Sequence, residues 1–119
     1  MKFLLLLSTA LLISVHPAHS EETELNDWAN CQIDEAIRLD DGKSDAATIA
    51  RAVSTSCSMK RELWLASVPS RSFPNDPKGA QAWMDYMRDQ DIHLSTAAVL
   101  SVRAKMRAKK AGRSHSYAR

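Results

Sequence analysis

The stretch NDWANCQIDEAIRL, residues Asn26–Leu39, decides the fold. Its apolar side chains recur at steps of three and four residues, which is the spacing of one face of an α-helix. Cys31 lies in the middle of the stretch, at the edge of that face. The other of the two cysteines is Cys57, in ARAVSTSCSMKREL at Ala50–Leu63, where the apolar residues follow the same spacing. The two cysteines are therefore predicted to lie on consecutive helices.

Three helical segments are predicted, over residues 23–39, 45–67 and 78–107, and no strand, because no period-two alternation persists. The third segment reads either as one helix or as two joined near 88–91, where Asp91 interrupts the apolar pattern; we favour one helix. Short connections between amphipathic helices are typical of an antiparallel bundle. The expected fold is all-α, a small three-helix antiparallel bundle with one interhelical disulfide.

The first twenty residues have the layout of a cleavable secretory signal. A basic start is followed by a 13-residue apolar run and then by Ala18 and Ser20, small residues before a cut at Glu21. The apolar run is too short to be read as a membrane span, and no second one follows. We expect cleavage after Ser20, a periplasmic or secreted protein without a transmembrane segment, a bundle domain at 21–107 and a flexible basic tail at 108–119.

Four roles are open to the cysteine pair: nucleophile, metal ligand, redox pair or structural disulfide. A catalytic thiol needs a neighbouring base, a zinc site needs about four ligands, and a redox pair usually has C-x-x-C spacing. None of these patterns is present. Cysteines of an exported chain usually pair, and an antiparallel hairpin can bring Cys31 and Cys57 together. We predict a disulfide between them, and no metal or cofactor.

Charge is distributed unevenly along the chain. Residues 21–45 hold nine acids and two bases, whereas 92–119 hold seven bases and no acid. Export argues against nucleic acid as a partner, and on a helical wheel the bases spread round the helix, unlike a membrane-surface helix. They either complement the end of the third helix or bind an anionic surface. The candidate residues are Arg103, Lys105, Arg107, Lys109, Lys110 and Arg113.

Three tryptophans, Trp28, Trp64 and Trp83, fall one on each predicted helix and on its apolar face. They either line an aromatic binding groove or fill one small core, and helical periodicity alone favours the core. Adjacent carboxylates on a helix point apart, and no nucleophile elbow, phosphate loop or metalloprotease motif is present. The sequence therefore indicates a protein without a catalytic site.

One resemblance supports this interpretation. The W-x-x-C at Trp28, the run SDAATIARAVSTSC that leads to Cys57, and the basic final segment resemble small exported proteobacterial proteins with two cysteines on consecutive helices. The resemblance covers residues 28–61 and implies a periplasmic or secreted helical protein, with no catalytic residues to transfer. The stretch SRSFPNDP before the third predicted helix departs from the pattern.

We therefore expect a non-enzymatic, disulfide-stapled protein of the cell envelope that acts through surface contacts, with another envelope protein as a candidate partner. One alternative is an inhibitor or immunity-type protein that binds a periplasmic hydrolase. Another is a protein that binds anionic envelope components, such as an anionic membrane surface, through the basic segment 103–113.

Overall fold

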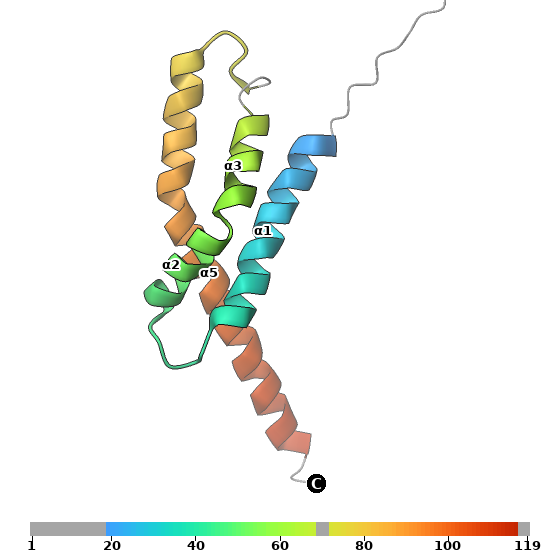
Figure 1. The fold of residues 1–119 in the computed structure, drawn as a ribbon. Coiled ribbons are helices and arrows are strands. Elements are labelled where there is room, and N and C mark those ends of the chain that lie inside the picture. The colour runs from blue at the N-terminus through green and yellow to red at the C-terminus, as the bar shows by residue number, and fades with distance from the viewer. Residues whose placement is uncertain (1–18, 69–71, 117–119) are drawn as a thin grey trace, which may run out of the picture.

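The computed structural model describes residues 19–68 and 72–116, and within them helices joined by turns are the only regular secondary structure (Figure 1). The elements are α1 (His19–Leu39), α2 (Ala46–Ser56), α3 (Ser58–Ser67) and α5 (Pro77–Ser116). The chain descends in α1, returns through α2 and α3, and descends again in α5, so that α1 and α5 run in the same general direction (Figure 1). The all-α prediction is confirmed.

The predicted count of three helices is wrong, because the segment 45–67 forms two helices that meet at Cys57. Its backbone there has φ −95° and ψ 4°. The junction lies in a run of serine, threonine and cysteine, which are moderate helix formers. Thr55 Oγ1 also donates a hydrogen bond of 2.9 Å to the Arg51 carbonyl, a contact that often bends helices. The apolar periodicity continues across the bend, so it gave no signal of the break.

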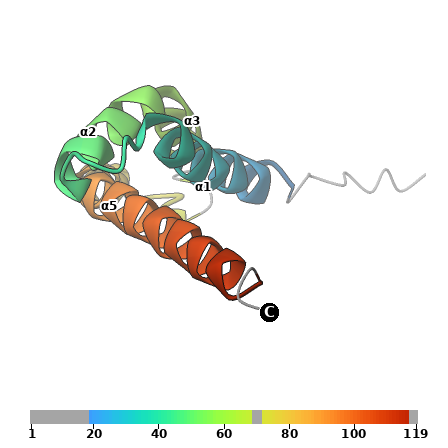
Figure 2. The same cartoon turned by 90° about the horizontal axis from the view of Figure 1, so that it is seen from below.

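The third predicted helix is a single helix of 40 residues, as favoured from the sequence, but it is longer than predicted. Pro77 occupies its first position, and Asp76 accepts a hydrogen bond of 2.9 Å from the Gly79 backbone N–H. The helix continues to Ser116, so residues 108–116, predicted as a flexible tail, are helical. Past the end of α1, α5 projects alone from the bundle (Figures 1 and 2).

The core lies between α1, the α2–α3 pair and α5. Trp28 and Trp64 are only 2% and 7% exposed, and their rings stack at a centroid distance of 5.0 Å. Trp83 meets the Trp64 ring edge-on at 5.5 Å. Trp28 and Trp64 therefore fill the core and Trp83 packs against it, as the simpler of the two interpretations predicted. Aliphatic residues complete it: Ile49, Val53, Leu65, Val68, Val99 and Val102.

The predicted disulfide between Cys31 and Cys57 is present, with a Cα–Cα distance of 5.9 Å. It joins the middle of α1 to the junction of α2 and α3. In the turn after α1, Gly42 has φ +68°, a conformation that favours glycine. Asp41 holds this turn by accepting backbone hydrogen bonds from Lys43 at 2.9 Å and Ser44 at 2.7 Å. The hairpin is thus fixed both at its turn and at its centre.

The predicted secretory signal, residues 1–20, lies mostly outside the described residues. Only His19 and Ser20 of it fall within them, at the start of α1. Cleavage after Ser20 stays a prediction. None of the described helices is both long enough and apolar enough to cross a membrane.

Candidate anion-binding surface

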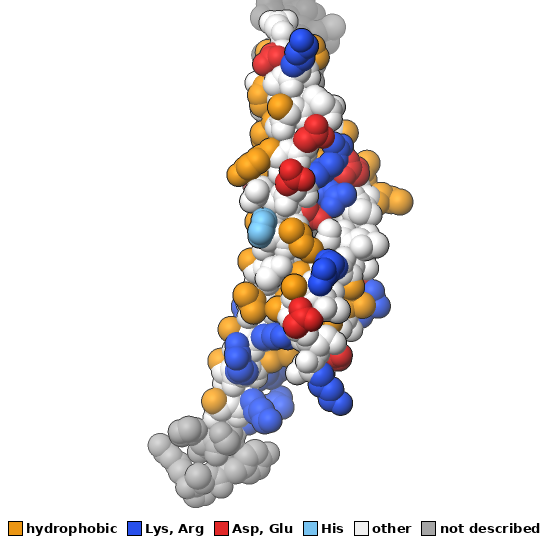
Figure 3. Space-filling view, turned by 90° about the vertical axis from the view of Figure 1, so that its left-hand side faces the viewer, with side chains coloured by type: hydrophobic (Ala, Val, Ile, Leu, Met, Phe, Trp, Pro, Cys, Tyr) orange, Lys and Arg blue, Asp and Glu red, His pale blue; other side chains and the backbone are white. Residues whose placement is uncertain are grey.

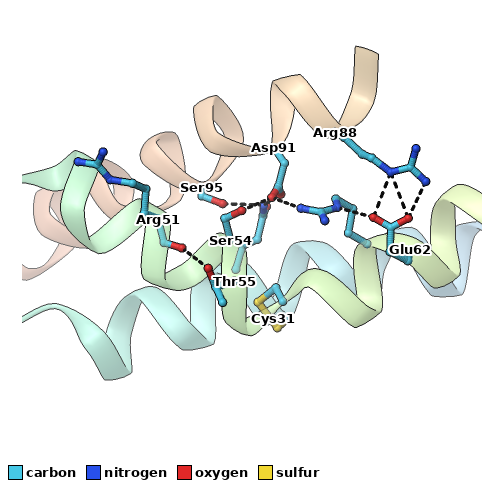
Figure 4. Close-up of polar contacts among 11 residues, drawn as sticks. Cys31, Arg51, Ser54, Thr55, Glu62, Arg88, Asp91 and Ser95 are labelled. Carbon is cyan, nitrogen blue, oxygen red and sulfur yellow. Dashed lines mark hydrogen bonds and ion pairs between the residues drawn. A yellow bond between two sulfur atoms is a disulfide. The ribbon is translucent and has the colours of Figure 1, made fainter. Parts of the chain in front are cut away.

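A buried carboxylate, Asp91 of α5, is 1% exposed and lies where all four helices approach one another (Figure 4). Arg61 of α3 donates to its Oδ2 at 2.6 Å, and Ser54 of α2 donates to the same oxygen. Gln32 of α1 donates from Nε2 to Asp91 Oδ1 and to Ser95 Oγ, both at 3.1 Å. One carboxylate is thereby connected to each of the other three described helices.

This buried cluster is a structural feature rather than a reaction site. Asp91, Ser95 and Gln32 are all less than a tenth exposed, so a ligand has no access to them. Within the described residues no group of three His, Cys, Asp or Glu side chains is arranged to hold a metal ion. A buried charge that loses its partners is strongly destabilising, so a shift of α5 that separates Asp91 from its partners is disfavoured. Asp91, which interrupts the apolar pattern of the sequence, thus links α5 to the other three helices.

A second ion pair joins the end of α1 to α5. Arg103 donates from Nε to Asp40 Oδ2 at 2.8 Å and from Nη2 to Oδ1 at 2.7 Å. It also donates to the Ser44 carbonyl at 2.7 Å. The guanidinium lowers the pKa of Asp40, and the carboxylate raises the pKa of Arg103. Arg103, one of the six predicted anion-binding residues, is therefore engaged within the fold.

The other five predicted residues remain on the surface. All are exposed, and none forms an ion pair with any residue that the structure describes. They lie where α5 projects past α1, and Lys and Arg side chains gather at that end of the molecule (Figure 3). We call these five residues the basic face: Lys105, Arg107, Lys109, Lys110 and Arg113.

The basic face covers a little over half of the helix circumference, in contrast to the predicted spread of bases round the whole helix. At 100° per residue its members fall within a sector of about 200°. That sector is centred near the positions of Val99 and Val102, which are buried against the bundle farther up α5. Small residues occupy the opposite side: Ala104, Ala108, Ala111 and Gly112. The side of α5 that is apolar within the bundle thus becomes basic where the bundle ends.

Two hollows border the start of the projecting segment, and Met106 lines both. The larger, of about 500 Å³, is an open hollow beside the turn after α1 and includes Asp41, Arg103 and Arg107. The smaller, which we call the apolar hollow, measures about 160 Å³ and lies between α1 and α5. Its lining is Ile33, Ile37, Val102, Lys105 and Met106.

Sequence reasoning located the bases but missed their neighbours. The apolar hollow combines residues of α1 and α5 that are 65 to 73 positions apart, so only the packing of the two helices creates it. Asp40 lies in the turn directly after α1, yet its side chain is only 2% exposed. Comparison with known proteins adds no relative, since no protein-family model, curated protein or solved structure matches the chain.

Proposed function

We propose that this chain is a non-enzymatic protein of an extracytoplasmic compartment that binds an anionic surface of the cell envelope through the basic face. The observation that carries the proposal is the position of the five bases: exposed, without carboxylate partners among the described residues, and on a helix that projects from the bundle. Bases that only complement the helix dipole at the C-terminal end of a helix can lie anywhere round its circumference, so the dipole does not explain their grouping.

Charge favours a lipid bilayer as the anionic surface. Residues 104–113 contain three lysines, two arginines and no aromatic residue. Protein interfaces are depleted in lysine and enriched in aromatic residues, whereas lysines near an anionic bilayer contribute about 1 kcal/mol each. Five such bases supply about 5 kcal/mol, which is enough for weak and salt-sensitive adsorption.

The disulfide and the buried ion pairs support this proposal by giving the basic face a rigid base. α5 is held to α1 by Gln32–Asp91 within the bundle and by Arg103–Asp40 where the projection begins. The bases therefore act as a fixed array rather than as a flexible tail. Pre-ordered side chains lose less entropy on binding.

The experiment compares two variants that carry the same change of charge. The first variant replaces four bases of the basic face by Gln: Arg107, Lys109, Lys110 and Arg113. The second replaces four exposed bases elsewhere on the fold by Gln: Lys43, Arg51, Lys60 and Lys78. Binding to phosphatidylglycerol-containing vesicles is measured by sedimentation. We expect the first variant to lose about 4 kcal/mol of binding free energy, because each base near the bilayer contributes about 1 kcal/mol.

The second variant is expected to bind nearly as tightly as the parent, since its four bases lie on other parts of the fold. Equal losses in the two variants would show that net charge alone drives binding, and would contradict a role for the basic face. Absence of vesicle binding by the parent protein at low salt would reject the bilayer as the partner.

A further inference from the structure

We infer that the apolar hollow between α1 and α5 receives one acyl chain of an anionic membrane lipid, while the bases beside it hold the head group. This inference rests on the proposed function and specifies how the bilayer is engaged. It assigns a role to the apolar side chains that the electrostatic proposal leaves unused.

The hollow joins an apolar lining to a cationic edge. Ile33, Ile37, Val102 and Met106 are apolar, and Lys105 is the one charged residue among the five that line it. Ile37 is 51% exposed and Met106 is 50% exposed, although both belong to the side of the molecule where α1 and α5 approach. Their apolar atoms face solvent at the point where the core ends and the basic face begins.

The helical wheel places the neighbouring charges on the same side. Lys109 and Arg113 follow Lys105 at four-residue intervals, so the three lie in a row along α5. An amphiphile lying across this row would put its anionic group on the bases and its chain against Ile37 and Met106. Lysine suits this position because its stem packs against apolar groups while its ammonium stays with the phosphates.

A protein partner fits this surface less well. Stable protein interfaces bury about 800 Å² on each side and have an apolar centre enriched in aromatic residues. Here a hollow of about 160 Å³ is followed by a lysine-rich segment of α5, residues 104–113, that holds no aromatic residue. A hollow of this size beside a cationic edge has room for a few methylene groups of one hydrocarbon chain.

The test places a fluorescent reporter in the hollow and an equivalent one outside it. Ile37→Trp puts an indole at the hollow, and Leu100→Trp puts one at a position of similar exposure, 50%, on another side of α5. Vesicles containing phosphatidylglycerol with brominated acyl chains quench indoles that contact the chains. The parent protein gives the background from Trp28, Trp64 and Trp83.

We expect the added fluorescence of Ile37→Trp to be lost on brominated vesicles, and that of Leu100→Trp to be retained. Equal quenching of the two, or none, in proteins that still sediment with the vesicles would overturn the inference and leave the proposed function standing. Failure of all the proteins to sediment with vesicles would reject both.

A second measurement does not depend on a reporter. Ile37→Asn is expected to weaken vesicle affinity about fivefold, because it removes part of an apolar contact, whereas Leu100→Asn should leave the affinity unchanged. Both positions are half exposed, so neither substitution disturbs the core. Equal affinities for the two variants would count against an acyl chain in the hollow.

Discussion

Arg103 of α5 and Asp40, the residue directly after α1, are joined by two hydrogen bonds, of 2.8 Å and 2.7 Å. The pair lies where α5 leaves the bundle, with the Asp40 side chain 2% exposed and that of Arg103 24% exposed. Of the six bases in residues 103–113, Arg103 is engaged in this pair, and the five bases of the basic face are exposed to solvent. This distinction leads to the first prediction.

Arg103→Gln is expected to lower the free energy of unfolding by about 2 kcal/mol, because it leaves the buried carboxylate of Asp40 without its cationic partner. Urea denaturation measures the change. The double variant Asp40→Asn with Arg103→Gln should lose less than the sum of the two single variants. If the losses of unfolding free energy in the two single variants add up to that of the double variant, the contact between Arg103 and Asp40 contributes nothing to stability.

Asp91→Ala is expected to destabilise the protein by about 3 kcal/mol, since it leaves Arg61 with only the partly exposed Glu62 as a counter-charge and leaves Gln32 without its buried acceptor. The Arg61 side chain is only 16% exposed. Replacing both residues by apolar ones, as in Asp91→Leu with Arg61→Met, should recover part of the loss. Calorimetric unfolding of the three variants tests this. If Asp91→Ala is as stable as the parent protein, Asp91 does not stabilise the fold.

Replacing Cys31 and Cys57 by Ala is expected to cost about 3.5 kcal/mol, because the disulfide closes a loop in the unfolded chain across a separation of 26 residues. Denaturation of the oxidised parent and of the double variant gives the difference. If the two proteins unfold at the same urea concentration, the disulfide is not a stabilising element.

Acid should weaken the turn after α1. The backbone N–H groups of Ser44 and Lys43, with the Ser44 hydroxyl, hold the pKa of Asp41 at about 2, below its usual value of 3.8. The unfolded chain therefore takes up a proton at Asp41 first as the pH falls. Asp41 thus contributes stability above about pH 4, and this contribution is lost as the pH falls to about 2.

The matched variant for this effect is Asp41→Asn. The stability difference between parent and variant should shrink steadily between about pH 4 and about pH 2, as followed by urea denaturation at each pH. A difference that stays constant over this interval would contradict the lowered pKa of Asp41.

The helices and the disulfide could be predicted from the sequence because both depend on local spacing. The positions of Leu25, Trp28 and Ala36 define a helix without reference to any other segment. The sequence holds two cysteines, on adjacent predicted helices of a chain that is predicted to be exported, so each has the other as its candidate partner. The bend at Cys57 could not be predicted in this way, because Val53, Cys57 and Trp64 keep the helical period on both sides of it.

The candidate site was harder to predict because it depends on which helices pack together. The row of bases is visible in the sequence, but the pairing of Arg103 with Asp40 spans 63 positions. In the sequence, Asp91 is visible only as an interruption of the apolar pattern of the third predicted helix. An acid at such a position, with a serine four residues later, is a signal of a buried polar cluster. Its partners Gln32 and Arg61 follow only from the fold.

The central claim is that the basic face binds an anionic bilayer, and equilibrium sedimentation of the oxidised protein with vesicles tests it most directly. Two compositions are compared, phosphatidylcholine alone and phosphatidylcholine with phosphatidylglycerol, each at about 0.05 M and about 0.5 M salt, where screening differs strongly. The account predicts binding to the anionic vesicles at low salt only. Equal binding to both kinds of vesicle, or binding that is unaffected by salt, would contradict it.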